Sequence, residues 1–348
     1  MAKNQLYIGT MSGTSLDGLD VCAVEFSGNI FHIHAAETFV FSTAWRNRLN
    51  DAFSISGVEL QQLSVDYGVF CGECINEFVR THNLKPAYIA SHGQTIFHTP
   101  HTGLTVQIGS GAHIAATTGI STVCDFRTLD VAMGGQGAPL VPIGDQFLFA
   151  DYDYCLNIGG FANVSTQQHG ARMAWDICAA NIVLNEYAKK HGQDYDESGN
   201  LGRKGEINQA LLQKLNRLPF YAQSAPKSLG REWVEREIVP ILHAHNLSDF
   251  DVMRTYYEHC AQEIGNTLQG KTTKTLCTGG GVCNSFLMER IAHYTQSQLL
   301  IPTPEIVHFK EALIFAYLGF LRVQGKENCL ASVTGARKNV CGAVIWEV

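Results

Sequence analysis

The sequence predicts an α/β protein with two lobes, and three observations carry this prediction. The chain has 348 residues, which is long for a single hydrophobic core and favours two domains. Hydrophobic residues make up 45% and charged residues 16%, a composition typical of ordinary globular proteins. Three apolar runs, at residues 5–9, 154–158 and 275–278, each end in a glycine-rich turn. We therefore expect a nucleotide to be held between two related lobes.

The first part of the chain predicts a hairpin, a further strand and a long helix. The two leading β-rich runs are joined by a turn rich in Gly, Ser, Thr and Asp, which favours a hairpin. Apolar residues at helical spacing then predict the helix. The predicted elements are strands at 5–9, 20–26 and 29–41, a helix at 60–82, and a strand at 87–91 that ends at His92.

The later part of the chain repeats this arrangement. A strand at 154–158 runs into Gly159 and Gly160, and residues 161–165 return as its partner. Asp176 is expected between a short strand and an apolar helix, and Glu311 is expected to open a helix over 312–321. The predicted domains are residues 1–130 and 131–348, with a C-terminal helix near 310–323 at the lobe interface.

The first glycine turn, residues 9–18, has the chemistry of an anion-binding loop. It lacks the lysine of a GxxxxGK[ST] loop and the spacing of GxGxxG. Successive amides in such a turn can bind phosphate, and Thr14 and Ser15 add hydroxyl donors. Asp17 and Asp20 could hold Mg²⁺, which prefers oxygen ligands. The alternative is a tight hairpin in which Asp forms the turn.

Two further glycine clusters favour nucleotide binding. Glycines after the strands at 154–158 and 275–278 let a ligand or a helix pack directly against the backbone. Each cluster alone is better explained as a bulge or a turn. Three such turns in one chain favour the functional interpretation.

Charge and composition exclude other classes of function. The formal net charge is −7 and there is no run of Lys or Arg, which argues against a nucleic-acid or anionic-membrane surface. No apolar run approaches 20 residues, so no membrane partner is expected. Eleven scattered cysteines fit reduced thiols in the cytoplasm.

Several motifs along the chain resemble those of one family, the anhydro-N-acetylmuramic acid kinases. They occur in family order from the first strand to the last ten or so residues. The matching segments are residues 8–20, 91–95, 125–127, 134–142, 157–160 with Asn163, 226–228 with 230–232, 310–312 and 332–336.

The resemblance implies a fold and an ATP site. The family is part of the acetate-kinase, sugar-kinase and actin superfamily, which implies two ribonuclease-H-like lobes around an interlobe ATP cleft. The implied ATP-binding residues are Gly13, Thr14, Ser15, Leu16, Asp17, Gly18, Leu19 and Asp20 in the first phosphate loop, Gly159, Gly160 and Asn163 in the second, and Gly279, Gly280 and Gly281 at the adenosine. The implied cofactors are ATP and Mg²⁺.

The resemblance also implies a reaction. Members recycle peptidoglycan in the bacterial cytoplasm, typically as homodimers, by cleaving 1,6-anhydro-N-acetylmuramic acid with water and phosphorylating O6. Water attack needs a carboxylate base, and Asp176 matches the family's base. Arg127 is expected to pair with the lactyl carboxylate, and Glu311 and His92 are expected to contact the sugar.

Each of these residues has a plainer interpretation. Asp176 could be a helix N-cap, and Arg127 could form a lobe-bridging ion pair. Glu311 could favour the dipole of a helix that it opens, and His92 could satisfy a turn.

The segment around the expected base departs from the family pattern. Family members usually have Asp-Thr-Gly-Pro-Gly-Asn, whereas this chain has Asp-Ile-Cys-Ala-Ala-Asn at residues 176–181. Ile177 removes a hydroxyl, and the added Cβ atoms narrow the approach to the backbone. Two alternative functions therefore stay open. One is a kinase for a different anhydro- or amino-sugar, and the other is a non-catalytic nucleotide-binding switch.

Overall fold

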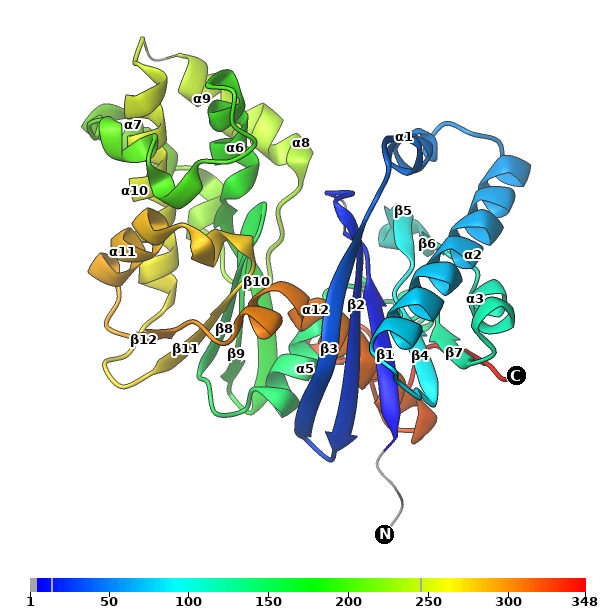
Figure 1. Cartoon of the computed structure of the whole chain (residues 1–348). Coiled ribbons are helices and arrows are strands. Elements are labelled where there is room, and N and C mark those ends of the chain that lie inside the picture. Colours follow the sequence, from blue (N-terminus) through cyan, green and yellow to red (C-terminus); the bar gives the residue numbers. More distant parts are fainter. Residues whose placement is uncertain (1–4, 14, 245) are drawn as a thin grey trace. The chain divides into compact units, whose positions relative to one another are not determined.

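The computed structural model describes residues 5–13, 15–244 and 246–348, which fall into two compact units (Figure 1). Unit 1 comprises Met1–Leu148 and Phe309–Val348, and unit 2 comprises Phe149–His308. This division differs from the predicted boundary after residue 130 and from the placement of the C-terminal segment with the second lobe. A Cβ on Gly9 would lie 1.9 Å from the carbonyl oxygen of Ala312, so the C-terminal helix packs directly on the first strand.

Unit 1 is built on a six-stranded sheet of order β13-β7-β4-β1-β2-β3. Strands β1, β2 and β3 form an antiparallel meander, and β4 and β7 run parallel to β1. The strands are β1 Leu6–Met11, β2 Gly18–Ser27, β3 Ile30–Val40, β4 Tyr88–Ser91, β7 Ser121–Cys124 and β13 Val344–Trp346, with a separate hairpin of β5 Gln94–Thr99 and β6 Leu104–Ile108.

The helices of unit 1 follow from caps and apolar spacing. The longest, α2, begins at a capping box in which Ser56 and Glu59 exchange hydrogen bonds, and it buries Leu63, Tyr67 and Ile75 along one face. The helices are α1 Thr43–Asp51, α2 Gly57–Thr81, α3 Gly111–Thr118, α4 Thr128–Ala132, α5 Val141–Leu148, α12 Pro304–Val323 and α13 Ala331–Thr334, of which α12 contains the second unit boundary.

Unit 2 has a five-stranded sheet of order β10-β9-β8-β11-β12. Strands β8, β9 and β10 form an antiparallel meander, and β11 is parallel to β8 and β12. Its elements are β8 Tyr154–Ile158, β9 Phe161–Gln168, β10 Ala171–Ala179, β11 Lys274–Thr278, β12 Gln298–Leu300, α6 Asn181–Lys190, α7 Gln209–Asn216, α8 Arg231–Trp233, α9 Val239–His243, α10 Asp249–Thr267 and α11 Ser285–Tyr294.

The two sheets share one topology. In each, a three-stranded meander is followed by two parallel strands on the far side of the first strand, which is the ribonuclease-H-like order. The predicted α/β fold with two such lobes is therefore confirmed. The predicted hairpin, the long helix and the strands that precede the glycine turns are also confirmed within a few residues.

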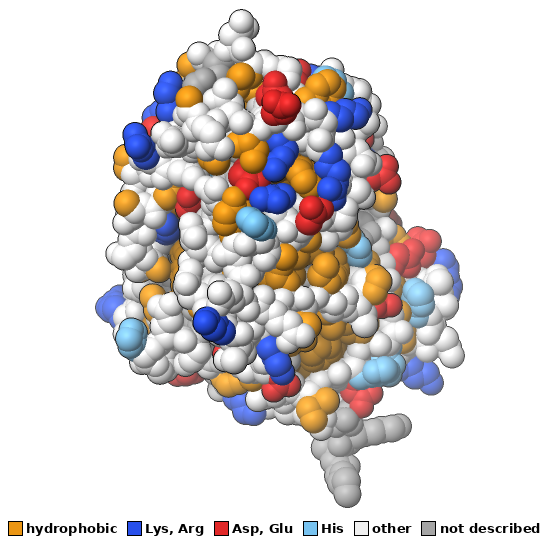
Figure 2. All heavy atoms as spheres, turned by 90° about the vertical axis from the view of Figure 1, so that its left-hand side faces the viewer, with side chains coloured by type: hydrophobic (Ala, Val, Ile, Leu, Met, Phe, Trp, Pro, Cys, Tyr) orange, Lys and Arg blue, Asp and Glu red, His pale blue; other side chains and the backbone are white. Residues whose placement is uncertain are grey.

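The surface carries mixed charge. Figure 2 shows acidic and basic side chains interspersed on the face that it draws, with apolar side chains between them. Among the residues that the structure describes, no helix combines the length and the apolar character needed to cross a bilayer.

Candidate active site

The first glycine turn links β1 to β2. Leu16 adopts φ of 55°, and its N–H donates to the carbonyl oxygen of Gly13 at 3.2 Å. Among the described residues, a Cβ on Gly13 would meet only the Ser15 hydroxyl, at 3.8 Å. Asp17 and Ser15 are exposed in the turn. Thr14 lies outside the described residues.

The end of the predicted phosphate loop belongs to strand β2. A Cβ on Gly18 would lie 2.6 Å from the carbonyl oxygen of Phe39, so this glycine is needed for sheet packing. The side chains of Leu16 and Leu19 are buried in the core of unit 1. Asp20 is half-buried, and its Oδ1 accepts from the Thr38 hydroxyl at 2.6 Å.

Parallel strands bring His92 and Arg127 together. Strands β4 and β7 are paired, and residues after their carboxyl ends lie at one edge of the sheet. Arg127 donates to Nε2 of His92 at 3.1 Å from Nε and at 2.8 Å from Nη2, and to the carbonyl oxygen of Gly137 at 2.6 Å. These contacts lie within unit 1.

The His92 imidazole is neutral and carries its proton on Nδ1. Burial and the adjacent Arg127 lower its pKa well below the ordinary value, and Nε2 accepts the arginine hydrogen bonds. Nδ1 makes no hydrogen bond of good geometry to the described residues, although the adjacent Gly93 backbone acts to raise the pKa of the ring. The side chain is 4% exposed. A buried donor of this kind is suited to a ligand oxygen.

Glu311 lies inside α12 and does not open a helix, because α12 already begins at Pro304. The expectation of a first-turn acid at Glu311 is therefore wrong. Burial raises the pKa of Glu311, while Lys310 and Arg127 oppose this shift. Asp20 raises the same pKa. The predicted sugar contacts of unit 1 and Asp20 therefore influence one another electrostatically.

In unit 2, Asp176 lies in a row of polar side chains that crosses the sheet. It pairs with Asn163 on β9, Asn163 pairs with Asn157 on β8, and Asn157 pairs with Thr278 on β11. Residues directly opposite in neighbouring strands project from the same face of a sheet. The register therefore aligns Asp176 with Asn163 and with the end of β8, where Gly159 follows.

A β-bulge sets the direction of Asp176. The register of β10 against β9 shifts between Asp176 and Cys178, so that one extra residue is inserted there. Bulges bend a strand and re-aim side chains, and they are enriched next to active sites. Asp176 is therefore a strand residue, and the N-cap of α6 is Ala180. The helix-cap interpretation of Asp176 is wrong.

The Asp176 carboxyl has one hydrogen bond that fixes its orientation. The N–H of Leu229 donates to Oδ2 at 2.7 Å. Burial raises the pKa of Asp176 above its ordinary range, and the Leu229 bond opposes that shift. A half-buried carboxylate with a raised pKa is suited to accept a proton.

The glycines of unit 2 that were predicted to bind ATP divide into two groups. A Cβ on Gly279 or Gly281 would lie within 2.6 Å of side-chain atoms at the end of β8, so these two glycines are needed for packing. In the part of the chain that the structure describes, a Cβ on Gly280 would meet nothing within 4 Å, and one on Gly159 or Gly160 would make only ordinary contacts at 3.7 Å or beyond. Gly280, Gly159 and Gly160 therefore leave backbone accessible to a ligand.

The residues that depart from the family pattern point into the core. Ile177, Cys178 and Ala180 are all buried and belong to the hydrophobic cluster of unit 2. The hydroxyl of Tyr256 donates to the carbonyl oxygen of Ala179 at 3.0 Å. The hydroxyl lost at Ile177 and the Cβ atoms added at Cys178 and Ala180 therefore fall on the core side of β10.

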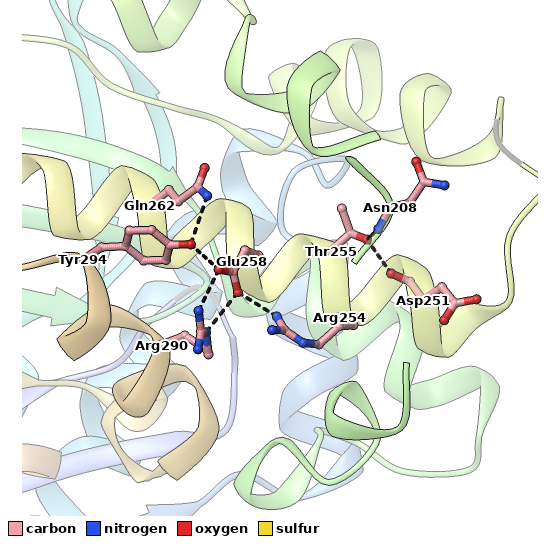
Figure 3. Close-up of polar contacts among 8 residues, drawn as sticks. All are labelled: Asn208, Asp251, Arg254, Thr255, Glu258, Gln262, Arg290 and Tyr294. Carbon is pink, nitrogen blue, oxygen red and sulfur yellow. Dashed lines mark hydrogen bonds and ion pairs between the residues drawn. The ribbon is translucent and has the colours of Figure 1, made fainter. Parts of the chain in front are cut away.

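Helix α10 packs behind this segment and is fixed by an ionic cluster (Figure 3). The buried Glu258 carboxylate accepts from Arg254 at 2.7 Å and from Arg290 at 2.8 Å, and the Tyr294 hydroxyl also donates to it. Although burial raises the pKa of Glu258, hydrogen bonds from Arg290, Tyr294 and Arg254 lower it to about 2.

Some site residues were missed by sequence reasoning. Lys227 and Leu229 contact Asp176 through their backbone groups. Lys227 was recognised only as part of a family motif without a role, and Leu229 lies outside the recognised motifs. Asn157 was seen as part of a family motif and Thr278 as a strand residue before a glycine turn, and neither was given a role. The signal for these two was their position at the carboxyl ends of strands β8 and β11.

The described residues contain no cluster of three or more His, Cys, Asp or Glu side chains that could hold a metal ion. Magnesium in kinase sites needs only one or two carboxylates beside the substrate phosphates. Asp20, at the base of the first glycine turn, is half-buried and fits such a role better than the exposed Asp17.

Two successive ribonuclease-H-like units with glycine turns at their strand ends define the acetate-kinase, sugar-kinase and actin class of proteins. The family model for anhydro-N-acetylmuramic acid kinase matches residues 5–347. The chain therefore belongs to this family of sugar kinases.

Named relatives match over their whole length. The anhydro-N-acetylmuramic acid kinase of Actinobacillus pleuropneumoniae serotype 3 is 35% identical, covering 99% of this chain and all of its own. The proteins of the same name from Pasteurella multocida and Haemophilus influenzae are 36% and 34% identical, covering 98% and 99% of this chain and 96% and 98% of their own. A solved activator of 2-hydroxyisocaproyl-CoA dehydratase from Clostridium difficile matches with a TM-score of 0.44 at 14% identity over 92% of this chain and 97% of its own, which is too weak to carry an argument.

Proposed function

We propose that this chain is an ATP-dependent hydrolytic kinase that converts 1,6-anhydro-N-acetylmuramic acid and water to N-acetylmuramic acid 6-phosphate. The single observation that carries the proposal is Asp176, which a bulge in β10 re-aims, and whose Oδ2 is fixed by the Leu229 N–H. Membership of the kinase family and the open glycines at 159, 160 and 280 support it.

The proposed reaction joins hydrolysis of the anhydro bond to phosphoryl transfer. Asp176 takes a proton from water while the water oxygen bonds to the anomeric carbon and the bond from that carbon to O6 breaks. O6 accepts the γ-phosphoryl group of ATP, and ADP leaves. Asp176 is the base, and Arg127, Glu311 and His92 contact the sugar. The Arg127 guanidinium binds the lactyl carboxylate, and the His92 Nδ1–H donates to a sugar oxygen.

ATP is held by backbone amides around Gly13, Gly159, Gly160 and Gly280, with Asn163 beside the phosphates. Asp20 would hold Mg²⁺, which supplies charge neutralisation for the phosphates when bound. We also propose a homodimer that works in the cytoplasm in peptidoglycan recycling. The interlobe ATP cleft implied by the resemblance stays a prediction.

A kinase for another anhydro- or amino-sugar is the second candidate, but the burial of Ile177 and Cys178 weakens the observation that favoured it. The test is incubation with Mg-ATP and the anhydro-sugar in ¹⁸O-water, followed by mass spectrometry of the product. We expect sugar 6-phosphate with ¹⁸O in the anomeric hydroxyl. Absence of the phosphorylated sugar, or label in the phosphate, would contradict the proposal.

A further inference from the structure

Residues 226–228 match a family motif but have no role in the reaction described so far. This segment and the residue that follows it contact the proposed base at two points. The Asp176 N–H donates to the carbonyl oxygen of Lys227 at 3.0 Å, and the Leu229 N–H donates to Oδ2 of Asp176 at 2.7 Å. Strand β10 is the edge strand of its sheet. Residues 227–229 therefore cover the free edge of β10 at the bulge.

These two contacts leave one oxygen of Asp176 available. Among the residues that the structure describes, Oδ1 of Asp176 accepts no hydrogen bond. Since Oδ2 is already engaged by Leu229, Oδ1 is the atom that can take a proton from water. Its direction then depends on how firmly residues 227–229 are held.

The Lys227 side chain holds this segment from the other side. Its Nζ donates to the carbonyl oxygen of Phe220 at 3.0 Å and lies 4.5 Å from the centre of the Phe220 ring. The carbonyl oxygen of Tyr221 lies 3.5 Å from the same nitrogen. Both carbonyls belong to the short 3-10 helix η4, Pro219–Ala222.

Helix η4 is in turn fixed to the core. Nε2 of His259 on α10 lies 2.8 Å from the Tyr221 hydroxyl, and Nδ1 lies 2.5 Å from Oδ1 of Asn216. Burial lowers the pKa of His259 to about 3, so the imidazole is neutral. Because the Asn216 oxygen can only accept, Nδ1 carries the proton and Nε2 accepts from Tyr221.

The charged and titratable groups that face Lys227 come from two elements. Burial lowers the pKa of Lys227, and Glu263 on α10 opposes this shift by favouring the charged form. The Cys178 thiol on β10 is neutral, because its contact with Cys260 and burial raise its pKa well above the ordinary value. Burial raises the pKa of Glu263 to about 7, and Lys227 opposes that shift. Burial raises the pKa of Asp176 and the Leu229 bond lowers it. Lys227 contacts Asp176 through its backbone carbonyl, which accepts from the Asp176 N–H.

We propose that Lys227 is a positioning residue, which anchors residues 227–229 to η4 so that Leu229 holds Oδ2 of Asp176 and leaves Oδ1 directed at the attacking water. The role in turnover rests on the proposed function. The effect on the Asp176 carboxyl does not, because it follows from the contacts alone.

The test is a ¹³C NMR titration of protein labelled at the aspartate carboxyl carbon, with the Asp176 signal identified by its loss in Asp176→Asn. In Lys227→Met the Leu229 bond loosens, and since that bond lowers the pKa of Asp176, we expect the pKa to rise by about 0.5–1 unit. Lys227→Arg, which keeps a charged donor, should restore most of the difference. Lys214→Met, on the exposed face of α7, is the matched control and should leave the titration unchanged.

Turnover of the anhydro-sugar gives a second measurement. We expect kcat of Lys227→Met to fall by about tenfold or more, with KM for the sugar changed much less and the acid limb of kcat moved to higher pH. If this variant does not fold, as judged by thermal melting, Lys227→Gln replaces it and should show a smaller change of the same sign.

An Asp176 titration in Lys227→Met that matches wild type would overturn the proposal, even if turnover falls. Failure of the wild-type protein to form sugar 6-phosphate would instead contradict the proposed function, and the titration would still decide the positioning role.

Discussion

The backbone N–H of Leu229 donates to Oδ2 of Asp176 at 2.7 Å, although the two residues are 53 positions apart in the chain. This bond anchors one carboxylate oxygen, and the other oxygen accepts no hydrogen bond from the described residues. It acts against the burial that raises the pKa of Asp176. The base of the proposed reaction is therefore oriented by a backbone group from a segment outside the sheet.

The pH dependence of turnover should reflect this balance. Asp176 must be ionised to take a proton, and its pKa lies above the ordinary aspartate value of about 3.9. We expect kcat to fall as the pH drops through an apparent pKa above about 4, measured at saturating ATP and sugar. Glu311→Gln is the control, because the pKa of Glu311 is also raised and its protonation would also change the rate at low pH. We expect kcat of this variant to fall over the same pH range as that of wild type. A rate that stays constant down to pH 4 would refute this assignment.

Ile177→Thr, which introduces the residue usual in the family, should lower the stability of the protein and leave binding of the sugar unchanged. Ile177 is 3% exposed within the unit 2 core, so the new hydroxyl would be buried, at a cost of about 1–3 kcal/mol. We expect a lower melting temperature with an unchanged KM for the sugar. An altered KM with unchanged melting would show that this position faces the substrate.

Gly280→Ala and Gly281→Ala form a matched pair. A Cβ on Gly281 would lie 2.3 Å from the Ile158 side chain, so this substitution should lower the free energy of unfolding by about 1–3 kcal/mol. A Cβ on Gly280 meets nothing within 4 Å, so its variant should melt like wild type. We expect Gly280→Ala to raise KM for ATP without lowering the melting temperature, because its Cβ would occupy space open to the nucleotide. Equal melting temperatures for the two variants would contradict the packing role of Gly281.

Glu258→Gln should destabilise unit 2, because it leaves Arg254 and Arg290 without their shared carboxylate. Breaking such a buried pair costs about 3–5 kcal/mol. The folded-state pKa of about 2 is below the ordinary glutamate value of about 4.3. Stability from Glu258 is therefore present above about pH 4.3 and is lost as the pH falls towards 2. Urea unfolding at pH 7 and pH 3 measures both effects. A difference between wild type and variant that does not shrink at pH 3 would contradict the assignment.

Local patterns predicted much of the fold. The hairpin of β1 and β2, helix α2 and the strands before the glycine turns depend on residues close together in the sequence, and all were predicted within a few positions. The unit boundary was not, because α12 packs against Gly9 across about 300 residues of chain. A proline at the start of α12 was the signal that the helix begins well before Glu311.

The sequence predicted which residues belong to the candidate site, but it did not predict the hydrogen bonds between them. His92 and Arg127 were proposed separately, but their mutual hydrogen bonds depend on the parallel pairing of β4 and β7. The family motif at 226–228 gave no hint that Lys227 and Leu229 flank Asp176. The bulge at Ile177 was also hidden, because a one-residue register shift leaves no periodic signal.

The most direct test of Asp176 as the base is the turnover of Asp176→Asn, compared with the exposed control Asp151→Asn. Asparagine keeps the shape and the Leu229 contact but cannot accept the proton. We expect kcat to fall by about 10²–10⁴-fold in Asp176→Asn, with ATP binding retained, and to stay at the wild-type value in Asp151→Asn. Wild-type turnover in Asp176→Asn would contradict the account.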